Sequence, residues 1–233
     1  MRKRTKIIAT IGPSSSSSSK LNEMILEGVD VFRINMSHSS IEQTKKIVEQ
    51  LKVESVKLKR PVATMIDLQG QKIRIKDLGK NKQILLKARD EFILDCALST
   101  GRGTNRCVGV TYKDLYKHLD VGDEILLSDA IIKLEVTKIN KTKIHTNVLR
   151  GGKLKPHQGL NKKGGGLTLR GITSKDKRDL RELLKFDIDY VAVSFVKDEK
   201  DIKEVRKIIS KKSIGIIAKI ERAEAISKID EIA

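Results

Sequence analysis

The feature that most constrains the fold is an alternation of apolar, β-branched segments with helix-like segments, which stops near residue 70 and resumes near residue 167. Such alternation predicts right-handed βαβ units around a parallel sheet, with functional groups at the carboxyl ends of the strands. The expected strands are 5–11, 30–35, 61–67, 189–195 and 214–221. The expected helices are 20–27, one whose inward face carries Val48, Leu51, Ser55 and Leu58, one that starts at 176–179, and 198–211.

Between residues 71 and 166 the pattern changes to short strands separated by turns. Strands are expected at 84–87, 91–95, 108–110, 124–127, 131–139 and 143–149. The last two flank Asn140 and Lys141 as a hairpin, and a glycine- and lysine-rich loop at 151–166 ends the region. The sequence therefore predicts one α/β domain, formed by 1–70 and 167–233, with a small antiparallel β domain inserted at 71–166. The expected parallel strands suit either part of a (β/α)₈ barrel or an open doubly wound sheet.

Composition limits the classes of protein to which the chain can belong. With 39% hydrophobic residues the chain can bury a core, and no apolar run approaches the roughly 20 residues of a transmembrane helix, so we expect a cytosolic, cytoplasmic protein that does not enter the membrane. The net charge of +18 suits a nucleic-acid binder, but aromatic residues make up only 3% and the lysines are spread along the chain, so nucleic acid is disfavoured as a partner.

Cys96 and Cys107 have neither disulfide nor metal-ligand spacing and are expected to be reduced thiols.

Six consecutive serines, at 14–19, separate the first expected strand from its helix. Their hydroxyls suit either a loop that contacts phosphate or a flexible connector whose last serine caps the helix. We favour the connector.

Two charged side chains mark the end of the last expected strand. Lys219 and Glu221 stand two residues apart after an apolar run, so both leave the same face of the strand. An ammonium next to a metal-binding carboxylate suits a site in which both groups act on one phosphate.

A second polar group follows the expected strand 30–35. Alternation sends Arg33, Asn35 and Ser37 to one side, which places a guanidinium for bidentate phosphate contact next to two neutral oxygen ligands for a cation. The alternative is that Ser37 and His38 only cap the next helix. Asp67 ends the third strand and adds a carboxylate at the same rim, although by itself it is equally typical of a turn or a helix cap.

Seven motifs resemble those of the pyruvate kinase family in order and spacing, and together they cover essentially the whole chain. They are TKIIATIGPS, RINMSH, DLQGQKIR, NKKGGGLTL, ITSKDKRDL, DYVAVSFV and IIAKIERAEA. The resemblance implies an α/β fold made of a partial (β/α)₈ TIM barrel, interrupted after its third strand by a small all-β, β-barrel-like lid domain. It also implies that three barrel strands and the family's C-terminal regulatory domain lie outside this sequence.

The implied function is the transfer of the phosphoryl group of phosphoenolpyruvate to ADP in glycolysis, which gives pyruvate and ATP, by a protein whose full-length form is a homotetramer. Arg33 would hold the substrate phosphate, Lys219 would stabilise the migrating phosphoryl group, and Glu221 would bind Mg²⁺. Such transfer depends on positioned positive charge more than on covalent chemistry. The family's second Mg²⁺ aspartate and its carboxylate-binding helix start come later in its sequence, so residues 1–233 alone are expected to be incomplete for catalysis.

The resemblance also assigns a pocket for a monovalent cation to Asn35, Ser37, Asp67 and the backbone of Leu68. Lys72 matches the class of the family in which a lysine ammonium replaces that cation, so activity is expected to be independent of K⁺. A tethered ammonium supplies the positive charge wanted near Asp67 without the entropy cost of binding an ion.

Three residues match positions at which the family contacts its nucleotide. Arg74, at the hinge of the lid, matches a contact to the nucleotide phosphates, and His38 lies where the nucleotide approaches. Gln158 stands where the family usually has a lysine, so one phosphate contact loses its charge.

Two further positions depart from the family pattern. Gln71 replaces a proline, which loosens the hinge into the lid because a fixed φ is lost, and Ala130 replaces a glycine in a tight turn that is strained if it needs a positive φ. Two alternative functions stay open: a non-catalytic fragment that binds phosphate, nucleotide or nucleic acid, and an interaction partner of a full-length homologue.

Overall fold

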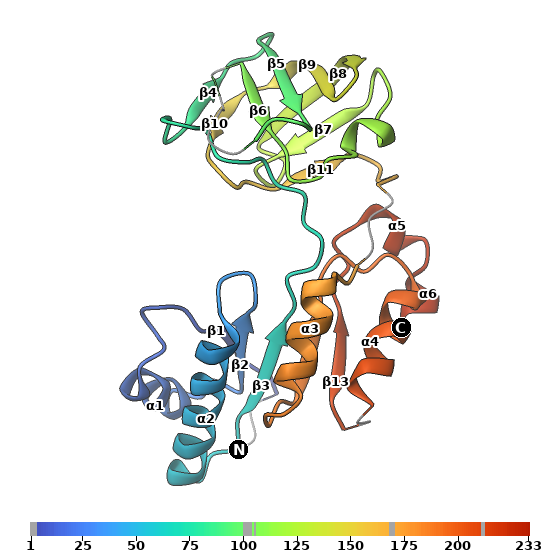
Figure 1. Cartoon of the computed structure of the whole chain (residues 1–233). Helices are drawn as coiled ribbons and strands as arrows, with labels where there is room; N and C mark the ends of the chain where they lie inside the picture. Colours follow the sequence, from blue (N-terminus) through green and yellow to red (C-terminus); the bar gives the residue numbers. More distant parts are fainter. Residues whose placement is uncertain (1–3, 100–103, 105, 168–170, 211–212) are drawn as a thin grey trace. The chain divides into compact units, whose positions relative to one another are not determined.

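The computed structural model describes residues 4–99, 104, 106–167, 171–210 and 213–233. It divides into two compact units, one formed by Met1–Gln71 with Arg170–Ala233 and the other by Lys72–Leu169 (Figure 1). The second unit therefore interrupts the first, in the region for which the sequence predicts an insert at 71–166. The described helices are all too short or too polar to span a bilayer.

A parallel sheet forms the centre of the first unit. Its order is β1 (Ile8–Thr10), β2 (Val31–Asn35), β3 (Ala63–Asp67), β12 (Tyr190–Val193) and β13 (Gly215–Ala218), and every neighbouring pair is parallel. The strands follow one another in chain order, without the reversal that defines a doubly wound sheet. The structure thus decides between the two architectures that the strand count left open: the sheet is wound in one direction, as in part of a (β/α)₈ barrel.

Helices bury their apolar faces against this sheet. They are α1 (Ser18–Leu26), α2 (Ile41–Leu58), α3 (Ser174–Leu183), α4 (Glu199–Ile209) and the short α5 (Ala223–Ile226) and α6 (Ile229–Ile232). One continuous core joins strand residues such as Phe32 and Val191 to helix residues such as Leu51 and Val205. Because this core contains segments from both sides of the insert, the first unit needs both parts of the chain to fold.

The start of α2 decides one alternative about the residues after β2. The Ser40 hydroxyl accepts a hydrogen bond from the Gln43 amide, while the Gln43 side chain accepts one from the Ser40 amide. This capping box satisfies the amides at the beginning of the helix. Ser37 and His38 therefore do not cap α2, and their position after β2 needs another explanation.

The serine run differs in detail from the expectation. α1 begins after Ser17, not after the last serine, and the Ser17 hydroxyl accepts a hydrogen bond from the first turn. Ser18 is already helical, and its hydroxyl donates to Glu54 of α2 at 2.8 Å. Glu54 is buried and takes the inward position expected for Ser55, because Ser18 and Asn22 satisfy its carboxylate.

The other face of the parallel sheet presents polar side chains at its carboxyl end. The register places Arg33 of β2 beside Thr10 of β1, and Asn35 of β2 beside Asp67 of β3. Phe32, which alternates with Arg33, is fully buried in the core. Alternation in neighbouring parallel strands therefore gathers these polar groups at one rim.

The second unit is a β structure with a core of its own. Its larger sheet has the order β11 (Leu160–Lys162), β7 (Glu124–Leu127), β8 (Ile132–Asn140), β9 (Lys143–Arg150), β5 (Glu91–Asp95) and β6 (Cys107–Gly109). β4 (Ile84–Leu86) pairs with β10 (Gly152–Leu154), and a short 3₁₀ helix, η1 (Leu115–His118), follows β6. β8 and β9 form the hairpin that the sequence predicts. One pair differs from the expected antiparallel arrangement, since β5 and β6 are parallel.

The region 151–166, expected to be a loop, contains strands β10 and β11. They pair with β4 and β7, which lie elsewhere in the sequence. Each strand is only 3 residues long, so no alternation marks it, and the glycines around it are typical of loops. The expectation was wrong because these strands owe their existence to tertiary pairing.

Both cysteines belong to the second unit and are free thiols. Cys96 is buried and Cys107 half-buried, and burial raises the pKa of both thiols above its ordinary value. The thiols are thus held in their neutral, less reactive form.

The second unit is expected to fold by itself, because its core is built from its own strands. A polypeptide of residues 72–169 should protect the amides of β8 and β9 from hydrogen exchange as the full chain does. A polypeptide of residues 1–71 is the matched control and should show no such protection, since it lacks β12 and β13. Unprotected amides throughout 72–169 would contradict the prediction.

The turn between β7 and β8 places three successive residues at positive φ: Ser128 at 55°, Asp129 at 53° and Ala130 at 67°. Replacing Ala130 with glycine is expected to raise the free energy of unfolding of the second unit by about 1 kcal/mol, since glycine adopts this conformation without steric cost. Urea denaturation measures the change. Ala97→Gly, at an exposed position without positive φ, is the control and should not stabilise the unit. Equal or lower stability of Ala130→Gly would show that the turn is not strained.

Candidate active site

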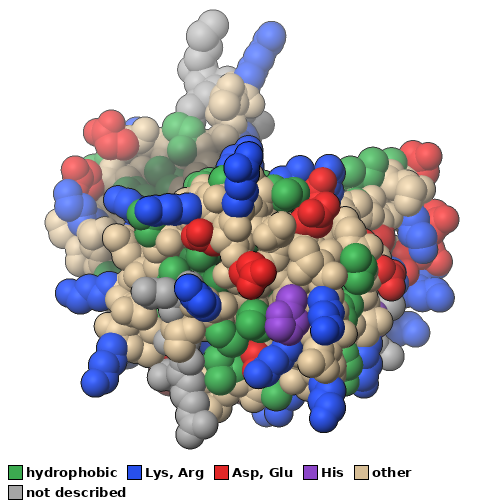
Figure 2. Space-filling model, turned by 90° about the horizontal axis from the view of Figure 1, so that it is seen from above, with side chains coloured by type: hydrophobic (Ala, Val, Ile, Leu, Met, Phe, Trp, Pro, Cys, Tyr) green, Lys and Arg blue, Asp and Glu red, His purple; other side chains and the backbone are tan. Residues whose placement is uncertain are grey.

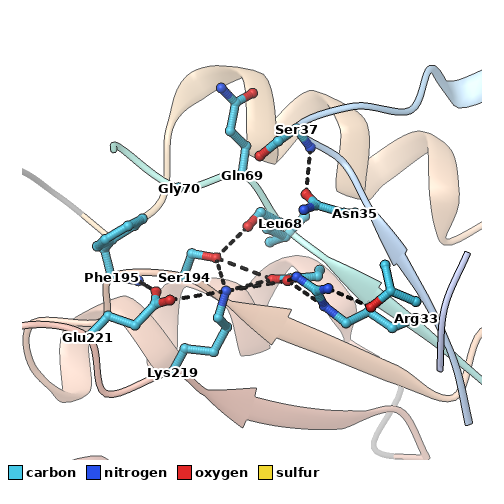
Figure 3. A network of polar contacts seen from close by, with 12 residues as sticks. Arg33, Asn35, Ser37, Leu68, Gln69, Gly70, Ser194, Phe195, Lys219 and Glu221 are labelled. Carbon is cyan, nitrogen blue, oxygen red and sulfur yellow. Dashed lines mark hydrogen bonds and ion pairs between the residues drawn. The ribbon is translucent and has the colours of Figure 1, made fainter. Parts of the chain in front are cut away.

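Asp67, at the end of β3, accepts hydrogen bonds from Arg33, Lys219 and Ser194 on the carboxyl rim of the first unit. Figure 3 shows these three donor side chains pointing toward one another. The Asp67 side chain is only 2% exposed and forms an ion pair with Arg33. The Arg33 Nε donates to the Asp67 Oδ2 at 2.8 Å, and Nη2 donates to the same oxygen. The remaining guanidinium nitrogen, Nη1, donates to the Thr10 hydroxyl at 2.7 Å. Groups on β1 and β3 thus fix the guanidinium of β2. Asp67 is therefore a charged residue of the rim, not merely a turn or cap aspartate.

Lys219 follows β13 and contacts the same carboxylate. Its Nζ lies 3.2 and 3.3 Å from the two carboxylate oxygens of Asp67 and 2.9 Å from the Ser194 hydroxyl. A further contact of 3.4 Å joins Lys219 to Glu221, as expected for side chains that leave the same face. The side chains of Lys219 and Arg33 stay 28% and 29% exposed, so both cations can contact a ligand.

Ser194 is a site residue that the sequence alone did not single out. It is 3% exposed, and its hydroxyl accepts a hydrogen bond from Lys219 and donates one to the Leu68 carbonyl at 2.6 Å. One hydroxyl thus connects the ammonium to the backbone just after Asp67. A signal for it exists in the strand pattern: Ala192 pairs with Asp67 in the register, and alternation sends Ser194 to the same face as Ala192.

Glu221 is positioned by a backbone amide. Its Oε2 accepts a hydrogen bond from the amide of Phe195 at 3.1 Å. Phe195 has a φ of 57°, a left-handed conformation that is rare for a bulky residue. The Glu221 side chain is 36% exposed, so its carboxylate can take part in a site for a hard cation.

Asn35, the last residue of β2, forms a turn with Ser37 at the end of the strand. The Asn35 Oδ1 accepts a hydrogen bond from the Ser37 amide at 2.9 Å (Figure 3). The register places Asn35 beside Asp67, and the Leu68 carbonyl follows directly. The rim therefore offers amide, carboxylate and carbonyl oxygens, which are groups that bind cations.

A cavity of about 770 Å³ opens at the carboxyl ends of β1 and β2. Its lining residues come from the end of β1 and the loop after it, from the end of β2 and the loop after it, and from α2. They are Thr10, Ile11, Gly12, Pro13 and Ser16, then Asn35, His38 and Ser39, and then Gln43, Lys46, Ile47 and Gln50. This volume lies within the range of small-molecule sites. His38 thus lines a cavity next to the polar network.

The predicted nucleotide contacts Arg74 and Gln158 belong to the second unit. Arg74 Nη1 donates to the His157 carbonyl at 2.9 Å. The Gln158 Oε1 accepts a hydrogen bond from the Ser128 hydroxyl in the turn between β7 and β8. Both side chains are therefore engaged within their own unit.

Lys72 is the first residue of the second unit. Its Nζ lies 3.9 Å from the Asp129 carboxylate. Its stem packs over Gly159, where an added Cβ would lie 2.5 Å from the Lys72 Cε and would displace the end of the lysine side chain. Inside the second unit, Asp129 is thus an anionic partner of this ammonium, whereas Asp67 has two cationic partners within the first unit.

The rim of the first unit combines a guanidinium, an ammonium and two carboxylates at the carboxyl end of a parallel sheet. A family model described as "Pyruvate kinase, barrel domain" matches residues 2–233. The chain belongs to the pyruvate kinase family. This result confirms the resemblance drawn from the seven motifs and the partial barrel that it implies.

Pyruvate kinases from several bacteria match nearly the whole chain. The pyruvate kinase of Buchnera aphidicola subsp. Schizaphis graminum is 45% identical over 226 residues, which are 96% of this chain and 47% of that protein. Pyruvate kinase II of Salmonella typhimurium is 38% identical over 226 residues, with the same two coverages of 96% and 47%. The pyruvate kinase of Geobacillus stearothermophilus is 37% identical over 237 residues, 100% of this chain and 40% of that protein. The chain therefore spans about half the length of these curated relatives.

Pyruvate kinases generally use Mg²⁺ and K⁺, and the residues present fit Mg²⁺ in part. Glu221 offers carboxylate oxygens at the rim. In the described part of the chain, no group of three or more His, Cys, Asp or Glu side chains is arranged to hold a metal ion. Mg²⁺ keeps several of its waters and needs only one or two carboxylates, so Glu221 suits one side of such an ion.

Proposed function

We propose that this chain carries the phosphoryl-transfer part of a pyruvate kinase active site, which converts phosphoenolpyruvate and ADP to pyruvate and ATP in glycolysis. The observation that supports this function is the grouping of Arg33 and Lys219 around Asp67. Two cations share one buried carboxylate, and both stay partly exposed, so both can contact the oxygens of a bound phosphate. Phosphoryl transfer depends chiefly on such positioned positive charge.

Each side chain of the rim has a proposed role. Arg33, held by Asp67 and Thr10, would bind the phosphate of phosphoenolpyruvate through two of its nitrogens. Lys219 would stabilise the charge on the migrating phosphoryl group. Glu221 would hold Mg²⁺, which when bound neutralises phosphate oxygens.

The cavity lined by His38 would receive the nucleotide. Its volume of about 770 Å³ suits a ligand of that size. Arg74 and Gln158 of the second unit would contact the nucleotide phosphates. Because Gln158 is uncharged and already bonded to Ser128, its contact is expected to be weak.

The direct test is a chimera in which residues 1–233 are joined to those parts of the Buchnera relative that lie outside the matched region. The chimera is expected to form pyruvate from phosphoenolpyruvate and ADP with Mg²⁺, at the roughly 1–100 s⁻¹ usual for kinases. The polypeptide 1–233 alone should be far slower, because it offers Mg²⁺ and the substrate few fixed ligands. A folded chimera without pyruvate formation would refute the proposed function.

Asn35, Ser37, Asp67 and the Leu68 carbonyl would form the pocket for a monovalent cation, with Lys72 supplying the charge in place of K⁺. The kcat of the chimera is then expected to be nearly the same in KCl and in choline chloride. Lys72→Glu should create a requirement for K⁺ of at least about tenfold in kcat, because it replaces the positive charge by a negative one.

The matched control for this prediction is Lys80→Glu, which changes an exposed lysine of the same unit and should leave the kcat in choline chloride unaffected. A chimera that already needs K⁺ for most of its rate would show that Lys72 does not take the role of the ion.

Surface charge gives little support to nucleic acid as an alternative partner. On the face in Figure 2, Lys and Arg side chains are interspersed with acidic and uncharged groups instead of forming one continuous patch. We further propose a cytoplasmic location and a homotetramer for the full-length protein. Association of the 233-residue chain with a full-length homologue remains the second candidate, and size-exclusion chromatography of a mixture of the two would detect it.

A further inference from the structure

A buried carboxylate lies behind the site, in the first turn of α3. Asp176 is 0% exposed. Its Oδ1 accepts hydrogen bonds from the amides of Gln69 and Gly70, at 3.0 and 3.4 Å, although these residues are 107 and 106 positions away in sequence. Its Oδ2 accepts hydrogen bonds from the amide and the hydroxyl of Thr173, at 2.9 and 2.6 Å.

These hydrogen-bond donors, together with the start of α3, stabilise the negative charge of Asp176. Within the described ranges, Asp176 forms no ion pair with a lysine or arginine. A buried carboxylate is costly to keep unless hydrogen bonds to its charged form stay in place. The carboxylate and the turn at 69–70 therefore fix each other.

The turn that Asp176 holds packs against the turn after β12. Gly70 has a φ of +63°, and an added Cβ would lie 2.9 Å from the Ser194 Cβ and 3.1 Å from the Phe195 Cδ2, so only glycine fits. Phe195 in turn donates its amide to Glu221. Figure 3 shows Phe195 between Gly70 and Glu221. A chain of close contacts thus runs from α3 to the carboxylate at the rim.

We propose that Asp176 is a positioning residue: it fixes the turn at Gln69 and Gly70, and through the contact of Gly70 with Phe195 it sets the position of the Glu221 carboxylate. The same turn follows Asp67 and precedes the boundary between the units, so Asp176 also anchors the point from which the chain leaves the first unit. This inference rests on the proposed function only for the identity of the ligand that Glu221 binds.

The experiment is Asp176→Asn in the 233-residue chain, with hydrogen exchange followed by NMR at single amides. One of the two acceptor oxygens becomes an NH₂ group and the negative charge is lost, which weakens or removes the hydrogen bonds from the amides of the turn. The amides of Gln69 and Gly70 should exchange at least about tenfold faster, and the Phe195 amide should change its chemical shift, while the amides of β2 keep their rates. A general loss of stability would accelerate all of them together.

Asp201→Asn is the matched control. Asp201 is also buried in the first turn of a helix, α4, but accepts hydrogen bonds from the amides of Gly171 and Lys197, at 3.2 and 2.8 Å. This variant should leave the exchange of Gln69 and Gly70 unchanged. An equal effect of both variants on these two amides, or no effect of Asp176→Asn, would overturn the proposal.

The unsubstituted chain provides a second measurement, which decides the question even if Asp176→Asn does not fold. The amides of Gln69 and Gly70 lie outside β3, yet they should exchange as slowly as those within it. Exchange at the rate of an exposed loop would overturn the proposal. None of these outcomes depends on catalysis, so an inactive chimera would refute the proposed function and leave this inference standing.

Discussion

Replacing Lys219 with methionine in the chimera is expected to lower the kcat for pyruvate formation about 1,000-fold. The Lys219 ammonium is held by Asp67 and Ser194 and is still partly exposed, so it can meet charge that develops on the migrating phosphoryl group. Methionine keeps most of the apolar stem but removes the charge. Steady-state kinetics of pyruvate formation measures the effect.

The control for this variant is Lys203→Met. Lys203 lies on α4, its side chain is 66% exposed, and it pairs with Glu199. Its replacement should leave kcat unchanged, and the residual rate of Lys219→Met sets the upper limit for activity from host enzyme. If Lys219→Met retained more than about a tenth of the rate, Lys219 would not be the group that stabilises the transferred phosphoryl.

Asp67→Asn is expected to lower the free energy of unfolding of the first unit by about 3 kcal/mol. The change leaves Arg33 and Lys219 beside a neutral amide at a position that is only 2% exposed. This loss of stability lies at the lower end of the range for a broken buried ion pair, because water can reach both cations. Urea denaturation of the 233-residue chain, followed by the amide signals of β2, measures it.

Asp187→Asn is the control for the stability prediction. Asp187 pairs with Lys52, but its side chain is 71% exposed, so its replacement should change stability by no more than about 0.5 kcal/mol. Equal effects of the two substitutions would show that the ion pairs around Asp67 do not stabilise the first unit.

Local features of this protein follow from its sequence, because near neighbours along the chain dictate them. Period-two alternation places Arg33 and Asn35 on one face of β2, and Lys219 and Glu221 on one face at the end of β13. The strand and helix rhythm predicts the parallel sheet, and the seven motifs identify the family, which the match over residues 2–233 confirms.

Sequence patterns predict little about a residue whose role depends on a partner that is distant in the sequence. Ser194 lies within the expected strand 189–195, yet its hydroxyl matters only because Lys219 and the Leu68 carbonyl come within reach. Asp176 looks like an ordinary acidic residue of a helix start, and the structure shows its carboxylate bonded to a turn that lies 106 or 107 residues earlier.

The sequence by itself thus determined the family and the type of most helices and strands. Only the tertiary structure decided that the sheet is wound in one direction, that Arg33 and Lys219 share the carboxylate of Asp67, and that β10 and β11 are strands. The physical reason is the range of the interactions. Propensity, alternation and capping act over a few residues, whereas strand order and ion pairing depend on which distant segments pack side by side.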